Sequence, residues 1–101
     1  MVSRLVLLIV CLLAPNLASA RTSVPKDIQS FIVNADACDH AAGEFDGSLS
    51  EQRQREIEED VVKYCQPAQK QLKLLKAKYK GDAKLTEIIR KHAYDSVTSF
   101  R

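Results

Sequence analysis

Apolar residues recur every three or four positions through the middle of the chain, which is the spacing of an amphipathic helix. The first such segment runs from Pro25 to about Asp39, and Pro25 suits the first turn of a helix. Its apolar stripe consists of Ile28, Phe31, Ile32, Ala35, Cys38 and Ala42. Gly43 marks a stop, and the following residues, 44–47, have the composition of a turn.

A second helix is predicted to follow this turn. Ser48 and Glu51 have the spacing of a capping box. The stripe behind them consists of Ile57, Val61, Tyr64 and Cys65. Pro67 either ends this helix or begins the next one.

The third predicted helix has the stripe Ala68, Leu72, Leu75 and Tyr79. Gly81 is expected to close it in the position that favours positive φ. Asp82 is a suitable N-cap for a fourth helix, which extends as far as Val97 in its longest form. The stripe of that helix is Leu85, Ile88, Ile89 and His92 or Ala93. No segment alternates with a period of two for long enough to be a strand, so the predicted fold is all-α, a small bundle of three to four helices.

Residues 1–20 have the pattern of a secretory signal peptide. Arg4 supplies the positive start, residues 5–13 form an apolar run too short to span a bilayer, and residues 18–20 form the Ala-x-Ala cleavage pattern. We therefore expect an exported protein, in the periplasm or outside the cell, that loses Cys11 with its signal. Residues 21–101 would then form one helical domain with a thin core.

Two cysteines remain after this cleavage, Cys38 and Cys65, and an oxidising compartment favours a disulfide between them. Their spacing matches no redox or metal motif. In a tight hairpin of the first two helices, Cys65 would lie at the far end from Cys38. The sequence therefore predicts a long polar loop, 39–47, that runs back along the second helix.

Charge is unevenly distributed along the chain. Nine acidic residues and two arginines lie between Asp36 and Asp60, and nine basic residues and two acidic ones lie between Lys63 and Lys91. One interpretation is that an acidic second helix packs antiparallel to a basic third helix and the two neutralise each other.

The other interpretation is a binding surface. Its acidic part would be Glu56, Glu59 and Asp60, and its basic part a stripe of Lys70, Lys73, Lys76 and Lys80. The stripe could meet a lipid surface, a wall polymer or an acidic protein. Nucleic acid is not expected as a partner, because the compartment is wrong, the stripe lacks arginine, and only Tyr79 is near enough to stack on a base.

A polar cluster lies between residues 36 and 46. His40 with Asp39, Glu44 and Asp46 offers ligands for a divalent metal, but the spacing is that of neither a zinc nor a calcium site. The same groups make poor catalytic machinery, so we expect neither an enzyme nor a cofactor. His92 is interpreted as a packed, hydrogen-bonded histidine of the core.

The chain resembles a loose group of small exported proteins, mostly bacterial, with the pattern Cys-x-His-x-x-Gly-Glu, then Arg, then Cys and a Lys-Tyr-Lys stretch. The matching residues are Cys38, His40, Gly43, Glu44, Arg53, Cys65 and 78–80. The resemblance implies a disulfide-linked helical domain and carries no information about a substrate.

The spacing of the polar residues also suggests a structural lock. Glu44 or Asp46 would pair with Arg53, and His40 would cap the first helix or bond the loop backbone.

The favoured function is a small exported binding or inhibitory module that acts on another protein of the envelope or the extracellular space. Two alternatives stay open: a metal-binding protein that uses His40 and its carboxylates, and a cationic protein associated with a membrane or cell wall. A homodimer is a further expectation, for which Leu74, off the main stripe of the third helix, is the indicator.

Overall fold

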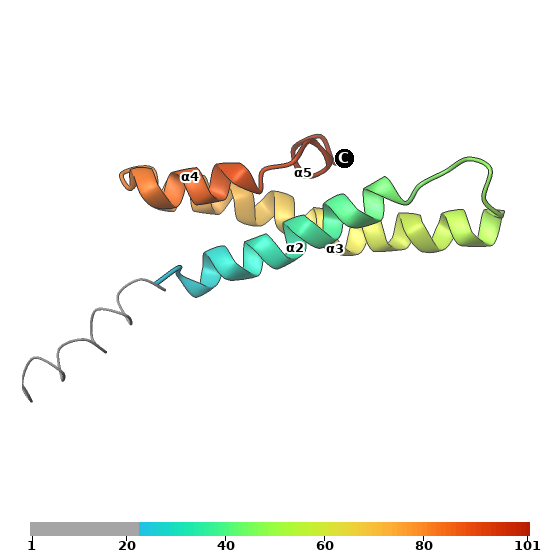
Figure 1. Ribbon diagram of the computed structural model, residues 1–101, viewed down its shortest axis with the longest axis horizontal. Helices are drawn as coiled ribbons and strands as arrows, with labels where there is room; N and C mark the ends of the chain where they lie inside the picture. Colours follow the sequence, from blue (N-terminus) through green and yellow to red (C-terminus); the bar gives the residue numbers. More distant parts are fainter. Residues whose placement is uncertain (1–22) are drawn as a thin grey trace, which may run out of the picture.

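A computed structural model describes residues 23–101 of the protein. Helix α2 (Lys26–Gly43) and helix α3 (Glu51–Lys78) form an antiparallel hairpin, and the short helices α4 (Ala83–Lys91) and α5 (Asp95–Thr98) fold back along the second half of α3 (Figure 1). All four elements of this described part are helices, which confirms the all-α bundle. The proposed signal peptide lies outside these residues.

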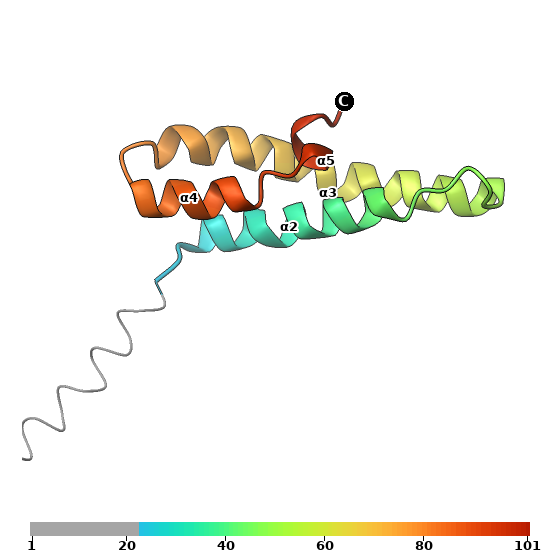
Figure 2. The same ribbon diagram turned by 45° about the horizontal axis from the view of Figure 1, so that its top comes forward.

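Helices α2 and α3 make the most extensive contact of the fold and leave the two ends of α3 in different surroundings. The turned view shows α4 and α5 beside the C-terminal half of α3, whereas the N-terminal half has only the end of α2 and the connecting loop beside it (Figure 2). The molecule is thus three helices thick at one end and two at the other.

The core lies along the α2–α3 interface. Its buried members come from every helix and are Ile28, Phe31, Ala35, Cys38, Cys65, Ala68, Leu72, Leu75, Ile89 and Val97. Ala41 and Ile57 are also buried, at the thin end of the molecule. These residues belong to the predicted stripes, except that Ala41 takes the place expected for Ala42 and that Val97, predicted only as the furthest extent of the last helix, joins the core.

The predicted second and third helices are one helix. Helix α3 passes through Pro67 without a break. A proline inside a helix removes one hydrogen bond and costs about 3 kcal/mol. Buried residues on both sides, Cys65 and Ala68, pack against α2 in one register, and this packing offsets the local cost. The predicted boundary at Pro67 is therefore wrong.

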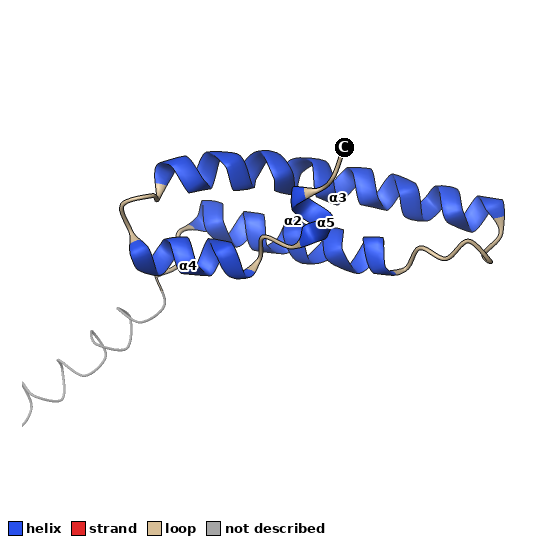
Figure 3. Ribbon diagram, turned by 90° about the horizontal axis from the view of Figure 1, so that it is seen from above, coloured by secondary structure: helices blue, strands red, loops and turns tan. Residues whose placement is uncertain are grey.

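The connection between α2 and α3 also differs in detail. Helix α2 extends to Gly43, and the loop is the shorter segment 44–50, which runs out beyond the end of α2 to the start of α3 (Figure 3). Part of the return path predicted for the loop is thus helical. The Gln54 side-chain amide donates to the carbonyls of Gly47, at 3.1 Å, and Leu49, at 2.8 Å, and holds the loop against α3.

Two predicted helix boundaries need correction. The N-cap of α3 is Ser50, whose hydroxyl accepts from the Arg53 backbone amide at 3.2 Å, whereas Ser48 bonds to Asp46 within the loop. No glycine among residues 23–101 has positive φ, so Gly81 does not use that conformation.

The last predicted helix is divided into two, α4 and α5. Asp82 does cap α4, by accepting from the Leu85 amide at 3.0 Å. The chain leaves the helix at His92 and starts again as α5 at Asp95. This break brings Val97 into the core, where it is fully buried.

Candidate functional site

The disulfide joins Cys38 near the end of α2 to Cys65 in the middle of α3. The two Cα atoms lie 4.7 Å apart and both side chains are fully buried. The pairing predicted from the sequence is confirmed, and it is compatible with an oxidising compartment outside the cytosol. The bond fixes the register of the hairpin at the point where the acidic half of α3 ends.

Two polar contacts fix the same register further along the hairpin. Asn34 donates to the Gln71 side-chain carbonyl at 3.0 Å, and the Gln71 amide donates to Ser30 at 3.1 Å. Asp27, at the start of α2, accepts from Lys78 at 2.7 Å and from the Tyr79 hydroxyl at 2.9 Å. The hydrogen bond from Lys78 is the main cause that lowers the pKa of Asp27.

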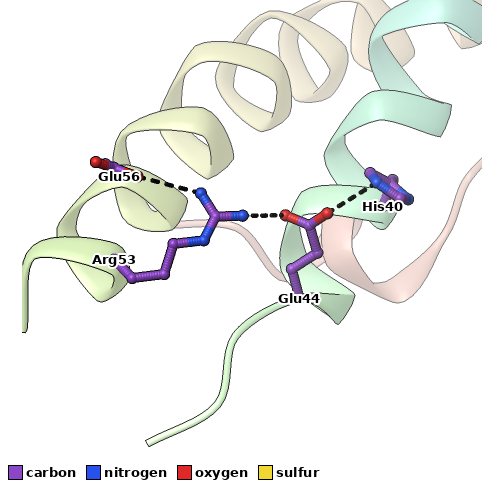
Figure 4. Close-up of polar contacts among 4 residues, drawn as sticks. All are labelled: His40, Glu44, Arg53 and Glu56. Carbon is purple, nitrogen blue, oxygen red and sulfur yellow. Dashed lines mark hydrogen bonds and ion pairs between the residues drawn. The ribbon is translucent and has the colours of Figure 1, made fainter. Parts of the chain in front are cut away.

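The predicted polar lock lies at the thin end of the molecule. Arg53 bridges Glu44 at 3.3 Å and Glu56 at 3.2 Å, and His40 contacts the other oxygen of Glu44 at 3.0 Å (Figure 4). The Glu44–Arg53 contact is therefore present. Arg53 reaches two carboxylates with one nitrogen each, rather than holding one carboxylate with two. His40 pairs with a side chain and does not bond the loop backbone.

The four candidate metal ligands do not converge. Asp39 accepts from the Ser96 hydroxyl at 2.9 Å, Asp46 accepts from the Ser48 amide and hydroxyl at 2.9 Å, and His40 pairs with Glu44. Among residues 23–101 no three His, Cys, Asp or Glu side chains are placed to share a metal ion.

A second polar cluster, unforeseen in the sequence, joins α2 to the segment before α5. The Tyr94 hydroxyl donates to Asp36 at 2.6 Å, and the His92 Nδ1 atom lies 3.0 Å from the same Asp36 oxygen. Burial alone would raise the pKa of Asp36, but the hydrogen bonds from Tyr94 and His92 hold it below its usual range. The bond to Asp36 raises the pKa of Tyr94 to about 12. His92 is thus hydrogen-bonded, as expected, but only partly buried.

Gln69 on α3 holds the C-terminal turn. Its side-chain amide lies 3.2 Å from the carbonyl of Val97, 3.4 Å from that of Thr98 and 2.7 Å from that of Phe100. Val97 and Thr98 end α5 and Phe100 lies just beyond it, and a helix of four residues leaves its last carbonyls without partners within itself. One side chain therefore fixes α5 against the middle of α3.

The continuous α3 overturns the neutralising arrangement of its charges. Its five acidic residues all precede Val61, and its five lysines all follow Val61. Two halves of one helix cannot pack side by side, so the acidic half and the basic half lie at opposite ends of the same rod. This order also matches the helix dipole, which favours acids near the N-terminus and bases near the C-terminus.

The basic stripe is exposed and unpaired within the described residues. None of the four lysines is within ion-pair distance of a carboxylate there, and residues 1–22 contain no Asp or Glu that could supply one. The four are Lys70, Lys73, Lys76 and, just beyond the helix, Lys80.

The acidic candidates are exposed as well. Glu56 forms an ion pair with Arg53. Glu59 lines a shallow hollow together with Arg55, Glu58 and Val62. Asp60 points to solvent without an ion pair among residues 23–101. At the acidic end, some of the carboxylates are thus in ion pairs, whereas the lysines of the basic stripe are in none among the described residues.

The basic stripe borders two adjoining hollows between α3 and the short helices. The first is lined by Gln69, Lys70, Leu72, Lys73, Lys76 and Thr98. The second is lined by Lys76, Lys80, Thr86, Ile89 and Arg90. Lys76 belongs to both, so the hollows form one groove, the basic groove hereafter. No acidic side chain lines it in the described part of the chain.

Neither a family model, nor a curated protein, nor a solved structure matches this chain. Across residues 23–101, no helix combines the length and the apolar composition needed to cross a membrane. The features of the described residues that point to a function are the charge distribution and the basic groove.

Proposed function

We propose that the protein is an exported, disulfide-linked helical module that binds another protein of the periplasm or extracellular space and so blocks or senses it. The observation that supports this most directly is the group of four unpaired lysines along the basic groove. Like charges gathered on one side repel one another, and an anionic partner relieves that repulsion.

The rest of the molecule supports a role as a rigid scaffold. The Cys38–Cys65 disulfide, the Gln71 bonds and the Gln69 contacts hold α2, α3 and α5 together, and Ile89 packs α4 into the core, all without using the lysines of the stripe. A surface that is already ordered before binding loses little conformational entropy on contact. The lysine side chains themselves remain available to a partner.

Export follows as part of the same proposal. The signal pattern of residues 1–20 would direct the chain out of the cytosol, and the disulfide is stable only where thiols are oxidised. Protein from the native compartment should therefore start at residue 21 and carry no free thiol.

Partner capture tests this function. The wild type and the double variant Lys73→Glu with Lys76→Glu would each carry a photo-crosslinker at Thr98, beside the groove, and be exposed to proteins of the native compartment. Lys26→Glu with Lys84→Glu changes the net charge equally at two helix starts outside the groove and is the matched control. A protein crosslinked to the wild type and the control but lost with the groove variant supports the proposal. Equal capture by all three, or none by any, contradicts it.

The same lysines favour a second candidate function, association with an anionic membrane or wall polymer. Attraction of this kind weakens steeply as salt screens it, over a Debye length of about 10 Å at 0.1 M. Sedimentation with isolated envelopes at low and high salt measures it. Release by salt of the wild type, together with no protein crosslink, would favour this candidate over the first.

A further inference from the structure

We infer that the basic groove is a docking site for an acidic amphipathic helix of a partner protein. The inference rests on the proposed binding function and names the chemistry of what is bound. Three properties of the groove lead to it: the spacing of its cations, the apolar character of its floor and its limited length.

The lysines are spaced as the carboxylates of a helix are. Lys70, Lys73 and Lys76 lie on successive turns of α3, about 4.5 Å apart along its axis. A helix with acidic residues at i, i+3 and i+7 repeats its carboxylates at about 4.5 to 6 Å. An extended strand places same-side residues about 6.6 Å apart and falls out of step with this ladder. The rim therefore suits a helix better than a strand.

The floor of the groove is apolar. Leu72 lines the first hollow and Ile89 the second, and both are core residues that show only an edge to the outside. A ligand with carboxylates alone would pair with the lysines but would make no apolar contact with Leu72 and Ile89. Leucine-like side chains on the same face as the acids would fill it, which is the usual manner in which an amphipathic helix enters a groove.

A lipid surface fits the groove less well than a helix does. Peripheral binding to a bilayer relies on large apolar side chains that enter the headgroup region beside the basic ones. In the described residues the large exposed apolar side chains are Val33, Phe45, Val62 and Leu74. None of them lines the groove, and Leu74, one turn after Lys70 on α3, is the single one of the four on the lysine segment.

Arg90 on α4 lines the same hollow as Lys80 and adds a further cation for an acidic ligand. Its guanidinium is held by Glu87, one turn earlier on α4, with Nε at 2.9 Å from the carboxylate. This pair is exposed, and it offsets part of the Arg90 charge. From Lys70 to Lys76 the rim covers about two turns of helix, so the docked segment is short.

The test uses a labelled synthetic helix of about 18 residues, about five turns, with glutamates at i, i+3 and i+7 beside a row of leucines. A scrambled peptide of identical composition has the same net charge, but its glutamates and leucines are not gathered on one side of the helix. Fluorescence anisotropy on the oxidised mature protein measures both dissociation constants. We expect the facial peptide to bind at least about tenfold more tightly than the scrambled one, a difference of about 1.4 kcal/mol.

Variants locate the site. Lys73→Glu with Lys76→Glu should weaken binding of the facial peptide by at least about tenfold, and Lys26→Glu with Lys84→Glu by no more than about twofold, since only nearby charges act strongly. Circular dichroism must show equal helicity for both variants. Equal loss in the two variants, or equal binding of the two peptides, would mean attraction by net charge alone and overturns the inference.

Other occupants are separate outcomes that also overturn it. Anionic vesicles that compete with the facial peptide at equal charge would assign the groove to lipid. Groove-dependent dimers in analytical ultracentrifugation would assign it to the acidic half of α3 from a second copy. If a native partner crosslinks through the groove and yet the facial peptide does not bind, the proposed function stands and the helix inference fails.

Discussion

Tyr94 donates a hydrogen bond of 2.6 Å to Asp36, and this bond joins the C-terminal segment to the middle of α2 across a separation of 58 residues. Both residues are partly open to solvent, yet His92 packs edge-on against the Tyr94 ring and contacts the same carboxylate. The three side chains position α5 so that its Val97 closes the core.

This contact makes stability sensitive to high pH. The pKa of Tyr94 is raised to about 12, above the unfolded value of about 10. Its contribution is therefore fully present below about pH 10 and is lost as the pH rises through about 12. The difference in phenolate absorbance between wild type and Tyr94→Phe reports this one side chain and should have its midpoint near pH 12. A midpoint near 10 would contradict the role of Asp36.

Removal of the disulfide should destabilise the fold strongly. Cys38 and Cys65 are 27 residues apart, and closing such a loop contributes about 3 to 4 kcal/mol in the chain-entropy account. Cys38→Ala with Cys65→Ala should lower the midpoint of thermal unfolding by roughly 15 °C or more. Wild type with reductant is the matched comparison, because it keeps both sulfur atoms in the core. A midpoint unchanged in both samples would mean that packing alone holds the hairpin.

Pro67 offers a way to stabilise the protein. Its ring removes one backbone hydrogen bond inside α3, and Pro67→Ala restores the donor. The greater freedom of alanine in the unfolded chain offsets part of this gain, which leaves a net stabilisation of about 1 to 2 kcal/mol. Urea unfolding measures it. A decrease in stability would show instead that the proline ring itself contributes to packing beside the disulfide.

Gln69 should govern the order of the C-terminal turn. Gln69→Leu keeps the size of the side chain but leaves the carbonyls of Val97 and Phe100 without their shared donor. We expect faster amide exchange and faster proteolysis confined to residues 95–101, with a cost of about 1 to 2 kcal/mol. Gln66→Leu, on the exposed surface one turn earlier, is the control. Equal exchange in the two variants would remove Gln69 from this role.

The polar lock at the thin end should contribute modestly. Arg53 and Glu44 are each more than a third exposed, and exposed ion pairs contribute about 0.2 to 1 kcal/mol. Arg53→Met should lower the unfolding midpoint by a few degrees and free the loop 44–50. Arg53→Lys should retain part of the effect, since it keeps the charge but loses the second contact. No change at all in Arg53→Met would refute the lock.

The sequence was sufficient for the helices and the disulfide because these depend on local spacing and on the number of cysteines. It was insufficient at Pro67, where the local rule favours a break and packing of both flanking halves against α2 prevails. That error placed the acidic and basic segments side by side, whereas they belong to opposite ends of one helix.

The contacts of the C-terminal segment had no sequence signal. Tyr94 and His92 meet Asp36, and Gln69 meets Phe100, only because the chain folds back at Asp82 and again at His92. By contrast, Glu44 and Arg53 are nine residues apart and flank one loop, so their contact was within reach of sequence reasoning. The lysine stripe was visible as a pattern, whereas the groove beside it requires α4 and α5 in place.

An uninterrupted helix with acids at one end and lysines at the other is a molecular dipole. A charged partner within about one Debye length, about 10 Å at 0.1 M salt, exerts a torque on such a rod and turns it before the two surfaces meet. Changes at Glu58 and Glu59, remote from the basic groove, should therefore alter the speed of encounter more than the lifetime of the complex. The acidic half of α3 would thus help to orient the basic groove toward an anionic partner without contacting that partner itself.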